Sequence, residues 1–427
     1  MALTPAHQDD GLQNSLQLAE GRLAGDLDRP AALITLETGK PGRTLSIYHT
    51  QSGYDLQNEL DFLSNRALEP NVFFSSRFLA PAMPRLEDRE VRLALIRDDL
   101  AGRSRLRYLM PFSIEKPGFS LGAPILRVWA NNFGPLGTPL VDSEGAAETL
   151  DHLLTALADP KAKLPQVLVI PDIRVRGPFT QLMKAIAMSR NLPVDVVGLS
   201  ERPMLESPED GETYLRASIK SSHLREMRRQ WGLLEQAGAG AASYNVARQP
   251  RDIRMRMEEF LLLEASGWKG RKRTAMLSDR YRAAMAREAV YNLAEIDQAR
   301  IHTIDLDGKA IASLIVLMMN GEAYAWKTAF DEAYARFSPG KLLMAQVTEW
   351  HLDDANITRT DSLAAPDHPI MSRFWRERET MGTLIVGLTP HADRDVRQAG
   401  SQLHLYQNTK SVAKMIREKI RAFAGRS

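Results

Sequence analysis

The stretch "AYAWKTAFDEAYARFSPGKLLMAQVTEW", residues 323–350, joins two kinds of secondary structure. Its first eight residues combine small and aromatic side chains, as in a buried β-strand, whereas its last part spaces apolar residues as an amphipathic helix does. Between them, Ser338 and Pro339 have the composition of a helix start, because serine suits the N-cap and proline the first helical position. The sequence therefore predicts a strand that leads into a helix beginning near residue 339.

The predicted helix start has the properties of an anion-binding site. The free amides of a first helical turn and the helix dipole both attract phosphate. Gly340 allows close approach of a ligand to the backbone, and Lys341 adds a positive charge at the same end. A pyrophosphate held beside a sheet is one interpretation. An ordinary capped helix is the other, and the tetrapeptide taken alone favours it.

Composition limits the classes of protein to which the chain can belong. Its 427 residues exceed one ordinary domain and predict two domains or a duplicated one. With 44% apolar and 25% charged residues it has the composition of a globular protein, and a net charge of +2 does not indicate a nucleic-acid partner. The absence of cysteine excludes disulfides and thiolate sites, and the sparse histidines show no metal-ligand spacing, so no metal is expected.

Two stretches of the sequence bear on export and membrane insertion, the first residues and the longest apolar run. The opening "MALTPAHQDDGLQNSLQ" carries an acidic pair and no long apolar run, which argues against a signal peptide. The longest apolar stretch, residues 309–321, falls short of the roughly 18 residues that a membrane helix requires. We therefore expect a cytoplasmic protein without a transmembrane segment.

Beyond residues 323–350, the sequence divides into two halves that show the same order of predicted elements. Each half reads as helix, helix, hairpin, strand, loop and helix, about 200 residues apart. In the second half the hairpin covers residues 299–330 and turns at Asp307-Gly308, a favoured turn dipeptide. The expected fold is α/β with a mixed sheet. Its expected divisions are a flexible segment 1–30, domains at 31–205 and 206–395, and a basic helix at 396–427.

Four segments of the second half carry a family resemblance. They are "EEFLLLEASGWKGRKRTAM" (258–276), "YAWKTAFDEAYARFSPGKLL" (324–343), "DSLAAPDHP" (361–369) and "RFWRERETMG" (373–382). Together they resemble the CelD-like acetyltransferase family of the GNAT superfamily, the acyl-CoA-dependent N-acyltransferases. The resemblance is strong over about 210–390. It is weaker over about 45–200, where "RALEPNVFF" and "GTPLVD" are similar to the family's N-terminal half.

The resemblance implies tandem GNAT-like acyltransferase domains, as in the related FemAB aminoacyltransferases. It implies acetyl-CoA or another acyl-CoA as co-substrate, held at Ser338, Pro339, Gly340 and Lys341. Backbone amides at Thr328, Ala329 and Phe330 would face the oxyanion of the tetrahedral intermediate. The chain departs from the usual GNAT phosphate loop, because "RFSPGKL" keeps one glycine and places a proline where a flexible residue is expected.

Matching motif positions supply four candidates for a general base, namely Glu264, Asp331, Asp361 and His368. Each has a structural alternative: pairing with Lys269 for Glu264, and turn or strand roles for the others. Candidate substrate-binding residues are Trp268, Lys269, Trp326 and Lys327. Strand alternation predicts that Trp326 points into the core and Lys327 to the opposite face.

Three functions follow from these observations. The first is acyl-CoA-dependent transfer to an amine or hydroxyl of a small molecule or of a glycan or cell-envelope precursor, including cellulose or other exopolysaccharide. The second is FemAB-like transfer from aminoacyl-tRNA, which the basic helices predicted at 218–231 and 410–421 would suit. The third is a non-catalytic accessory role in polysaccharide assembly. We expect the donor only in the second half, because the corresponding loop of the first half, "NNFGPLGTPLVD" (131–142), has no basic residue. The sequence leaves monomer and dimer equally open.

Overall fold

The computed structural model describes residues 22–23, 30–86, 90–100, 103–118, 122–238, 241–366 and 368–406. Nearly all of the predicted flexible segment 1–30 lies outside these ranges. So do residues 407–427, the larger part of the basic helix predicted at 396–427, whose first residues 396–406 are described.

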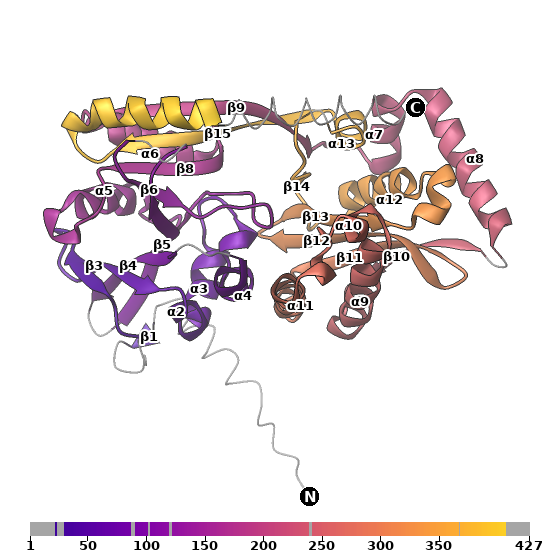
Figure 1. Cartoon of the computed structure of the whole chain (residues 1–427), viewed down its shortest axis with the longest axis horizontal. Helices are drawn as coiled ribbons and strands as arrows, with labels where there is room; N and C mark the ends of the chain where they lie inside the picture. The colour runs from indigo at the N-terminus through magenta and orange to yellow at the C-terminus, as the bar shows by residue number, and fades with distance from the viewer. Residues whose placement is uncertain are drawn as a thin grey trace, which may run out of the picture.

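A single mixed sheet runs through both halves of the described chain (Figure 1). Its strands lie in the order β10-β11-β12-β13-β14-β9-β15-β8-β6-β5-β4-β3-β2, and the short strands β1 and β7 pair with β5. The expectation of an α/β fold with a mixed sheet is thereby confirmed. The strands are β1 (Arg22–Leu23), β2 (Ile34–Glu37), β3 (Arg43–His49), β4 (Arg92–Leu100), β5 (Arg103–Glu115), β6 (Ile125–Val128), β7 (Leu140–Val141), β8 (Val167–Arg174), β9 (Val194–Leu205), β10 (Ala242–Ala247), β11 (Ala299–Leu306), β12 (Lys309–Met319), β13 (Glu322–Phe330), β14 (Arg359–Asp361) and β15 (Glu377–Gly387).

Helices cover the sheet in both halves, and the expected order of elements is present twice. The first half has α2 (Ser52–Asp55), α3 (Gln57–Asn65), α4 (Ser76–Leu86), α5 (Ala146–Ala158) and α6 (Pro178–Ser189), with 3-10 turns η2 (Val72–Phe74) and η3 (Pro160–Ala162). The second half has α7 (Gly211–Ser218), α8 (Ser221–Ala237), α9 (Pro250–Ser266), α10 (Trp268–Arg271), α11 (Arg280–Ala294), α12 (Pro339–Asp353) and α13 (Met371–Phe374), with 3-10 turns η4 (Met276–Ser278), η5 (Glu332–Phe337) and η6 (Pro390–Ala392). A final helix covers 393–406.

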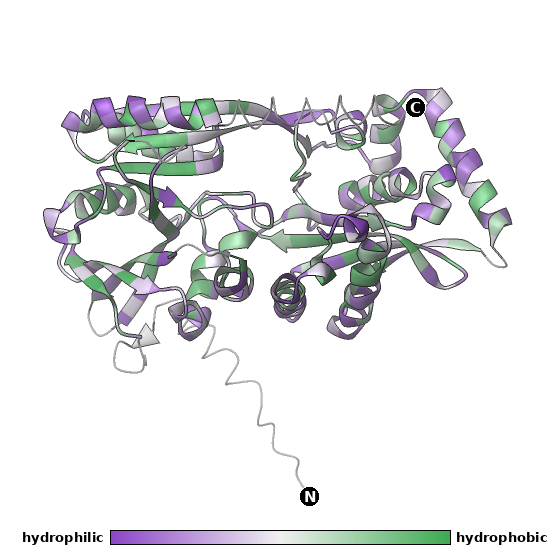
Figure 2. Ribbon diagram, in the orientation of Figure 1, coloured by the Kyte–Doolittle hydropathy of each residue, from purple (hydrophilic) through white to green (hydrophobic). Residues whose placement is uncertain are grey.

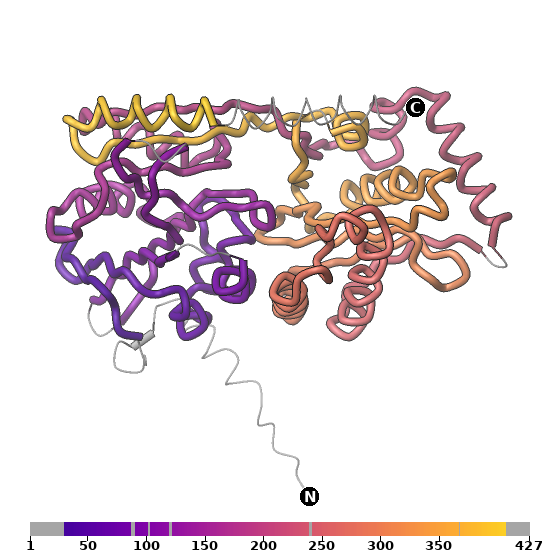
Figure 3. The backbone as a smooth tube through the Cα atoms, in the orientation of Figure 1, coloured from indigo at the N-terminus to yellow at the C-terminus, as the bar shows by residue number. Residues whose placement is uncertain are grey.

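The halves are joined by two long strands that run side by side along one edge of the view in Figure 3, β9 and β15. β15 comes from the end of the chain, yet it pairs with β9 on one side and β8 on the other, and so completes the sheet of the first half. At the other end of β9, Leu205 and Met204 pair with β14 of the second half. The division into domains 31–205 and 206–395 stays a prediction. β15 belongs by sequence to the second of them but pairs with β8 and β9 of the first.

Apolar residues recur along the strands and along the helices that cover them (Figure 2), and their buried side chains form two main cores. One large core includes residues of α3, α4, α9 and α11 and of the strands of both halves. A second core lies under α7, α8, α12 and α13 on the other face of the second half. α12 therefore packs against its own core. Its first turn follows β13 and η5, and the candidate site lies around these elements.

Candidate active site

The neighbouring strands β13 and β14 separate soon after they begin. They are parallel and pair only where residues 322–324 face 359–361. The sequence predicts a strand as far as residue 365, but β14 ends at Asp361, and Leu363 has a φ of 50°, which lies outside the β region. Among the described residues, β13 therefore has no partner strand on that side along 325–330.

A β-bulge lies in the part of β13 that pairs with β12 but not with β14. Ile315 of β12 faces Lys327, and the next residue, Val316, faces Ala325, so that Trp326 is the extra residue. The bulge interrupts the alternation of side chains. The expectation that Lys327 faces away from Trp326 is therefore wrong, because both side chains reach the same loop of the first half.

That loop follows β6 and is bound by two hydrogen bonds from β13. Trp326 Nε1 donates to the carbonyl of Phe133 over 2.6 Å, and Lys327 Nζ donates to the carbonyl of Asn132 over 2.9 Å. Lys327 Nζ also lies 4.6 Å from the centre of the Phe133 ring. The loop of the first half thus contacts β13 directly at the bulge.

Lys327 is half-buried and has an unusual charge environment. Burial, with the nearby positive charge of Lys269, lowers the pKa of Lys327 to about 8. At pH 7 roughly a tenth of this amine is therefore unprotonated, against less than a thousandth for an ordinary lysine. Lys327 can accept a proton at neutral pH far more readily than an exposed lysine can.

The buried Glu264 pairs with the partly exposed Lys269 next to the same strand. Glu264 accepts from Lys269 Nζ over 2.8 Å through one oxygen and from the Met276 amide over 2.8 Å through the other. Lys269 Nζ also donates to the carbonyl of Thr328 over 3.1 Å. Both carboxylate oxygens of Glu264 accept hydrogen bonds, so the residue has the structural role of pairing with Lys269. Together with the bond from Lys269 to Thr328, these contacts connect α9 to η4 and β13.

Two candidates from the sequence, Asp331 and Trp268, make contacts at the start of η5. Asp331 accepts from the Ala333 amide over 2.9 Å and so caps η5. The amide of Trp268 donates to Glu332 over 2.7 Å, while the exposed Trp268 ring lies 4.6 Å from Lys272 Nζ. Both candidates have structural contacts outside the space next to Lys327.

Asp361 and His368 lie in separate places beyond β14. Asp361 is fully buried, 3.1 Å from Arg202 Nη1, and accepts from the Leu363 amide over 2.7 Å. His368 Nδ1 accepts from the amide of Met371 over 3.2 Å, at the start of α13, and burial lowers the pKa of the imidazole. The structure therefore does not bring the four predicted base candidates together at one centre.

The start of α12 differs from the expected capped helix. Ser338 lies in the left-handed region with φ 54° and ψ 48°, and its side chain makes no capping hydrogen bond. The expectation of a hydroxyl cap is wrong because such a cap requires an extended N-cap residue. Instead the carbonyl of Ser338 accepts from the amide of Lys341 over 2.9 Å. Pro339 occupies the first helical position, as expected.

Gly340 and Phe330 meet at this helix start. No described group accepts the amide hydrogen of Gly340. A β-carbon added at Gly340 would meet only the Phe330 ring, at 3.8 Å, so the space in front of the first turn is open. Thr328 and Phe330 are exposed, and Ala329 is buried.

A cavity of about 460 Å³ opens beside the first turn of α12, and we call it the basic cavity. Lys341 lines it together with Lys220 and His223 from the start of α8 and with Arg373 from α13. Glu226 is the one carboxylate in its lining, and it pairs with Arg229. Within the described chain, Lys220, Lys341 and Arg373 have no ion-pair partner.

Sequence reasoning assigned no role to Lys220, His223 or Arg373. The signal was the basic composition of the helix predicted at 218–231, which we related only to tRNA, and of residues 373–378, which we used only for the family resemblance. No group of three or more histidine and acidic side chains in the described ranges is arranged to hold a metal ion. None of the helices in those ranges is long and apolar enough to cross a membrane.

The chain is similar to known proteins in sequence and in fold. Residues 221–368 match the family model "Acetyltransferase (GNAT) domain". The C-terminal domain of a putative lysylphosphatidylglycerol synthetase from Agrobacterium fabrum superposes with a TM-score of 0.50 at 12% identity, covering 84% of this chain and 96% of that one. The crystal structure of FemX gives a TM-score of 0.52 at 10% identity, covering 80% and 97%. The search of curated proteins gave no match.

These identities are low, so the two structures show the fold alone. That fold extends over both halves of the chain, and the expected GNAT-like α/β fold is confirmed. Its division into tandem domains stays a prediction. The finer resemblance to the CelD-like family stays a prediction. Residues 221–368 are therefore similar to GNAT acetyltransferase domains, and the described chain has a GNAT-like fold.

Proposed function

We propose that the chain transfers an acyl group from acyl-CoA to an amine or hydroxyl acceptor, and that the basic cavity holds the donor's phosphates. The observation that carries this proposal is the set of unpaired cations around the start of α12. Lys220, Lys341 and Arg373 line the cavity, and no described carboxylate pairs with them. Phosphates would supply the missing negative charge.

The helix start itself adds to the attraction. The Gly340 amide has no described acceptor, and the positive end of the α12 dipole lies at the same place. Because Pro339 has no amide hydrogen and that of Lys341 is already bonded, side-chain cations carry more of the binding here than in a glycine-rich loop. This arrangement suits the departure of "RFSPGKL" from the usual GNAT pattern.

The unpaired part of β13 suits the rest of the donor. An extended arm that contains amides can pair with an exposed strand edge, and 325–330 offers one that ends beside Gly340. An acyl group carried there would lie near Thr328, Ala329 and Phe330, the proposed source of amides for the oxyanion. Asn132 and Phe133 form the opposite wall, so the acceptor would enter between the halves.

Lys327 suits the proton transfer that this reaction requires. The nitrogen of the acceptor attacks the thioester carbonyl, the tetrahedral intermediate expels the thiolate, and the attacking nitrogen loses a proton. Lys327, with its pKa lowered to about 8, is the described side chain best able to take that proton. It replaces Glu264, Asp331, Asp361 and His368 in this role.

Aminoacyl transfer from tRNA is the second candidate. The observation that favours it is the match to FemX, which covers 97% of that structure. The acceptor, including a glycan or cell-envelope precursor, stays a prediction under either candidate.

Thermal unfolding with a matched set of donors tests the proposal. We expect acetyl-CoA and CoA to raise Tm and pantetheine, which lacks the phosphates, to have little effect, since a ligand that binds only the folded state must stabilise it. Equal shifts from CoA and pantetheine would contradict the role of the basic cavity. Retention of charged tRNA at two salt concentrations without any response to CoA would favour the second candidate. No response to either donor would contradict both transferase candidates and favour a non-catalytic role.

A further inference from the structure

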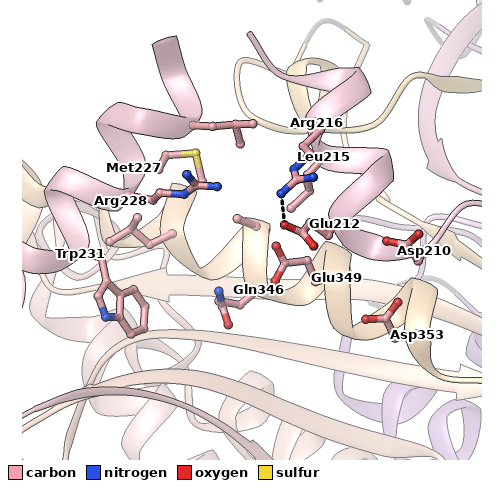
Figure 4. A pocket seen from close by; sticks show the side chains of 13 residues that line it. Asp210, Glu212, Leu215, Arg216, Met227, Arg228, Trp231, Gln346, Glu349 and Asp353 are labelled. Carbon is pink, nitrogen blue, oxygen red and sulfur yellow. Dashed lines mark hydrogen bonds and ion pairs between the residues drawn. The ribbon is translucent and has the colours of Figure 1, made fainter. Parts of the chain in front are cut away.

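A second cavity, of about 560 Å³, lies on the other flank of α8. Figure 4 shows it between α7, α8 and α12, and we call it the amphipathic cavity. Met227 of α8 lines both cavities, whereas the other lining residues differ. Nothing in the proposed transfer requires this second space.

One side of the amphipathic cavity is apolar. It is formed by side chains from all three helices, namely Leu215, Leu224, Met227, Trp231, Leu342 and Ala345. The Trp231 indole is partly buried and anchored, because its Nε1 donates to Glu235 over 2.9 Å. Such a surface suits the hydrocarbon or aromatic body of a small ligand.

The other side carries carboxylates, and three of the four have partners within the protein. Asp210 caps α7 by accepting from the Thr213 amide over 2.9 Å. Asp353 accepts from the Gly211 amide over 3.0 Å. Glu212 forms an ion pair with Arg216, drawn as the dashed line in Figure 4. These three carboxylates stabilise the protein itself.

Glu349 is the fourth, and it has no hydrogen-bond or ion-pair partner among the described residues. Its carboxylate points into the space between α7 and α12, toward Glu212 (Figure 4). Half-burial, with repulsion from Asp353 and Glu212, raises the pKa of Glu349, and Arg228 opposes this only in part. The negative charge on Glu349 is thus held where it is unfavourable without a cation.

We propose that the amphipathic cavity binds a small organic ammonium ion, with its charge on Glu349 and its apolar body against Met227 and Trp231. An ammonium group would relieve the repulsion among the carboxylates and donate hydrogen bonds to Glu349. The aromatic face of Trp231 would attract the same cation or pack against its body. A carboxylate ligand of the same shape would meet the repulsion that already acts on Glu349. This proposal goes beyond the proposed acyl transfer and does not depend on it.

Three probes of one shape test the choice of charge. Phenethylamine, 2-phenylethanol and 3-phenylpropionate share a phenyl body and differ in their polar end. We expect calorimetry or ligand-observed NMR on the full chain to give a Kd for the amine at least tenfold below that of the alcohol, with no binding of the acid. Equal affinities for the three probes, or a preference for the acid, would overturn the proposal.

Two substitutions should move the amine affinity in opposite directions. Glu349→Gln keeps the shape and removes the charge, and we expect phenethylamine to bind at least tenfold more weakly. Arg228→Gln removes the competing cation from the lining, and we expect tighter binding. Each variant's Tm without probe is measured first. If Glu349→Gln fails to fold, Arg228→Gln still decides, because unchanged or weaker amine binding in that variant would contradict the proposal.

Discussion

The helices α5 and α12 begin at corresponding places in the two halves, but the charged side chains near their first turns differ. Before α5, the fully buried Asp142 accepts from Arg105 Nε over 2.8 Å and from Arg107 over 3.3 Å, with Arg66 at 3.4 Å. Before α12 no carboxylate takes this place, and the cations of the basic cavity have no partner among the described residues.

The comparison teaches how the two halves balance the positive charge near these helix starts. In the first half Asp142 supplies the negative charge, whereas the proposed function assigns that role in the second half to the phosphates of the donor. We therefore still expect one donor molecule per chain, bound in the second half. Calorimetry that gave two CoA per chain would contradict this difference.

Gly340→Asp should have the largest effect, because it would place in the second half the carboxylate that the first half already has. The new β-carbon would meet only the Phe330 ring, and an acidic residue in a first helical turn is mildly favourable to the helix. We expect the Tm without ligand to stay near that of the wild type and the shift caused by acyl-CoA to disappear.

Gly232→Asp is the matched control. Gly232 lies in α8, and a β-carbon there would meet nothing within 4 Å. This variant should keep its response to acyl-CoA. A response that survives Gly340→Asp would remove the start of α12 from the donor site.

Asp142→Ala tests the role of the buried carboxylate in the first half. The substitution leaves Arg66, Arg105 and Arg107 without their shared counter-charge, and we expect a loss of about 3 kcal/mol in the free energy of unfolding. If Asp142 takes the place of a bound anion, inorganic phosphate should stabilise this variant more than the wild type. Equal phosphate responses in urea titrations would show that the resemblance between the two helix starts is only geometric.

Acid should also affect the stability of the two halves differently, because α12 contains one buried histidine, His351, and packs near another, His302. His351 of α12 lies 2.8 Å from Thr360 Oγ1, and its Nε2 has no partner. Burial lowers the pKa of His351 to about 3, and burial also lowers that of His302, whose ring centre lies 5.3 Å away. The corresponding helix α5 instead has the half-exposed His152.

Because the folded state keeps both imidazoles neutral, the unfolded chain binds their protons first as pH falls below about 6.5. Each histidine should therefore cost about 1.4 kcal/mol of stability at pH 5.5 relative to pH 7.5. Urea titrations of the wild type and of His351→Gln at both pH values measure this. An identical pH dependence in the variant would contradict the assignment to His351.

Local patterns were sufficient to predict most of the elements. The hairpin at 299–330, the helix from Pro339 and the repeated order of elements follow from periodicity and turn dipeptides, which depend on neighbouring residues. The bulge at Trp326 was not predictable, because it is defined by register against β12. The left-handed Ser338 was also missed, since it depends on how η5 ends.

The chemistry of the site was less predictable than the fold. Lys341 carries a local signal, whereas Lys220 and Arg373 come to the same cavity from distant parts of the chain. Likewise, the lowered pKa of Lys327 depends on Lys269 and on burial next to Phe133, and no spacing in the sequence indicates either. Glu264 was a natural candidate from its motif, but only the structure shows that both its oxygens are occupied.

Lys341→Ala should give the smallest effect and separates the contribution of side chains from that of the helix start. The Gly340 amide, Lys220 and Arg373 would all remain, so the donor should still bind. Loss of one charge-assisted contact to phosphate is worth about 1.5 kcal/mol, and we therefore expect the Kd for CoA to rise roughly tenfold. Lys272→Ala removes a cation that lies over Trp268 and outside the lining of the basic cavity, and it should leave the Kd unchanged. Equal effects of the two variants would mean that general surface charge attracts CoA. A complete loss of binding in Lys341→Ala alone would instead mean that this side chain, and not the shared cavity, holds the phosphates.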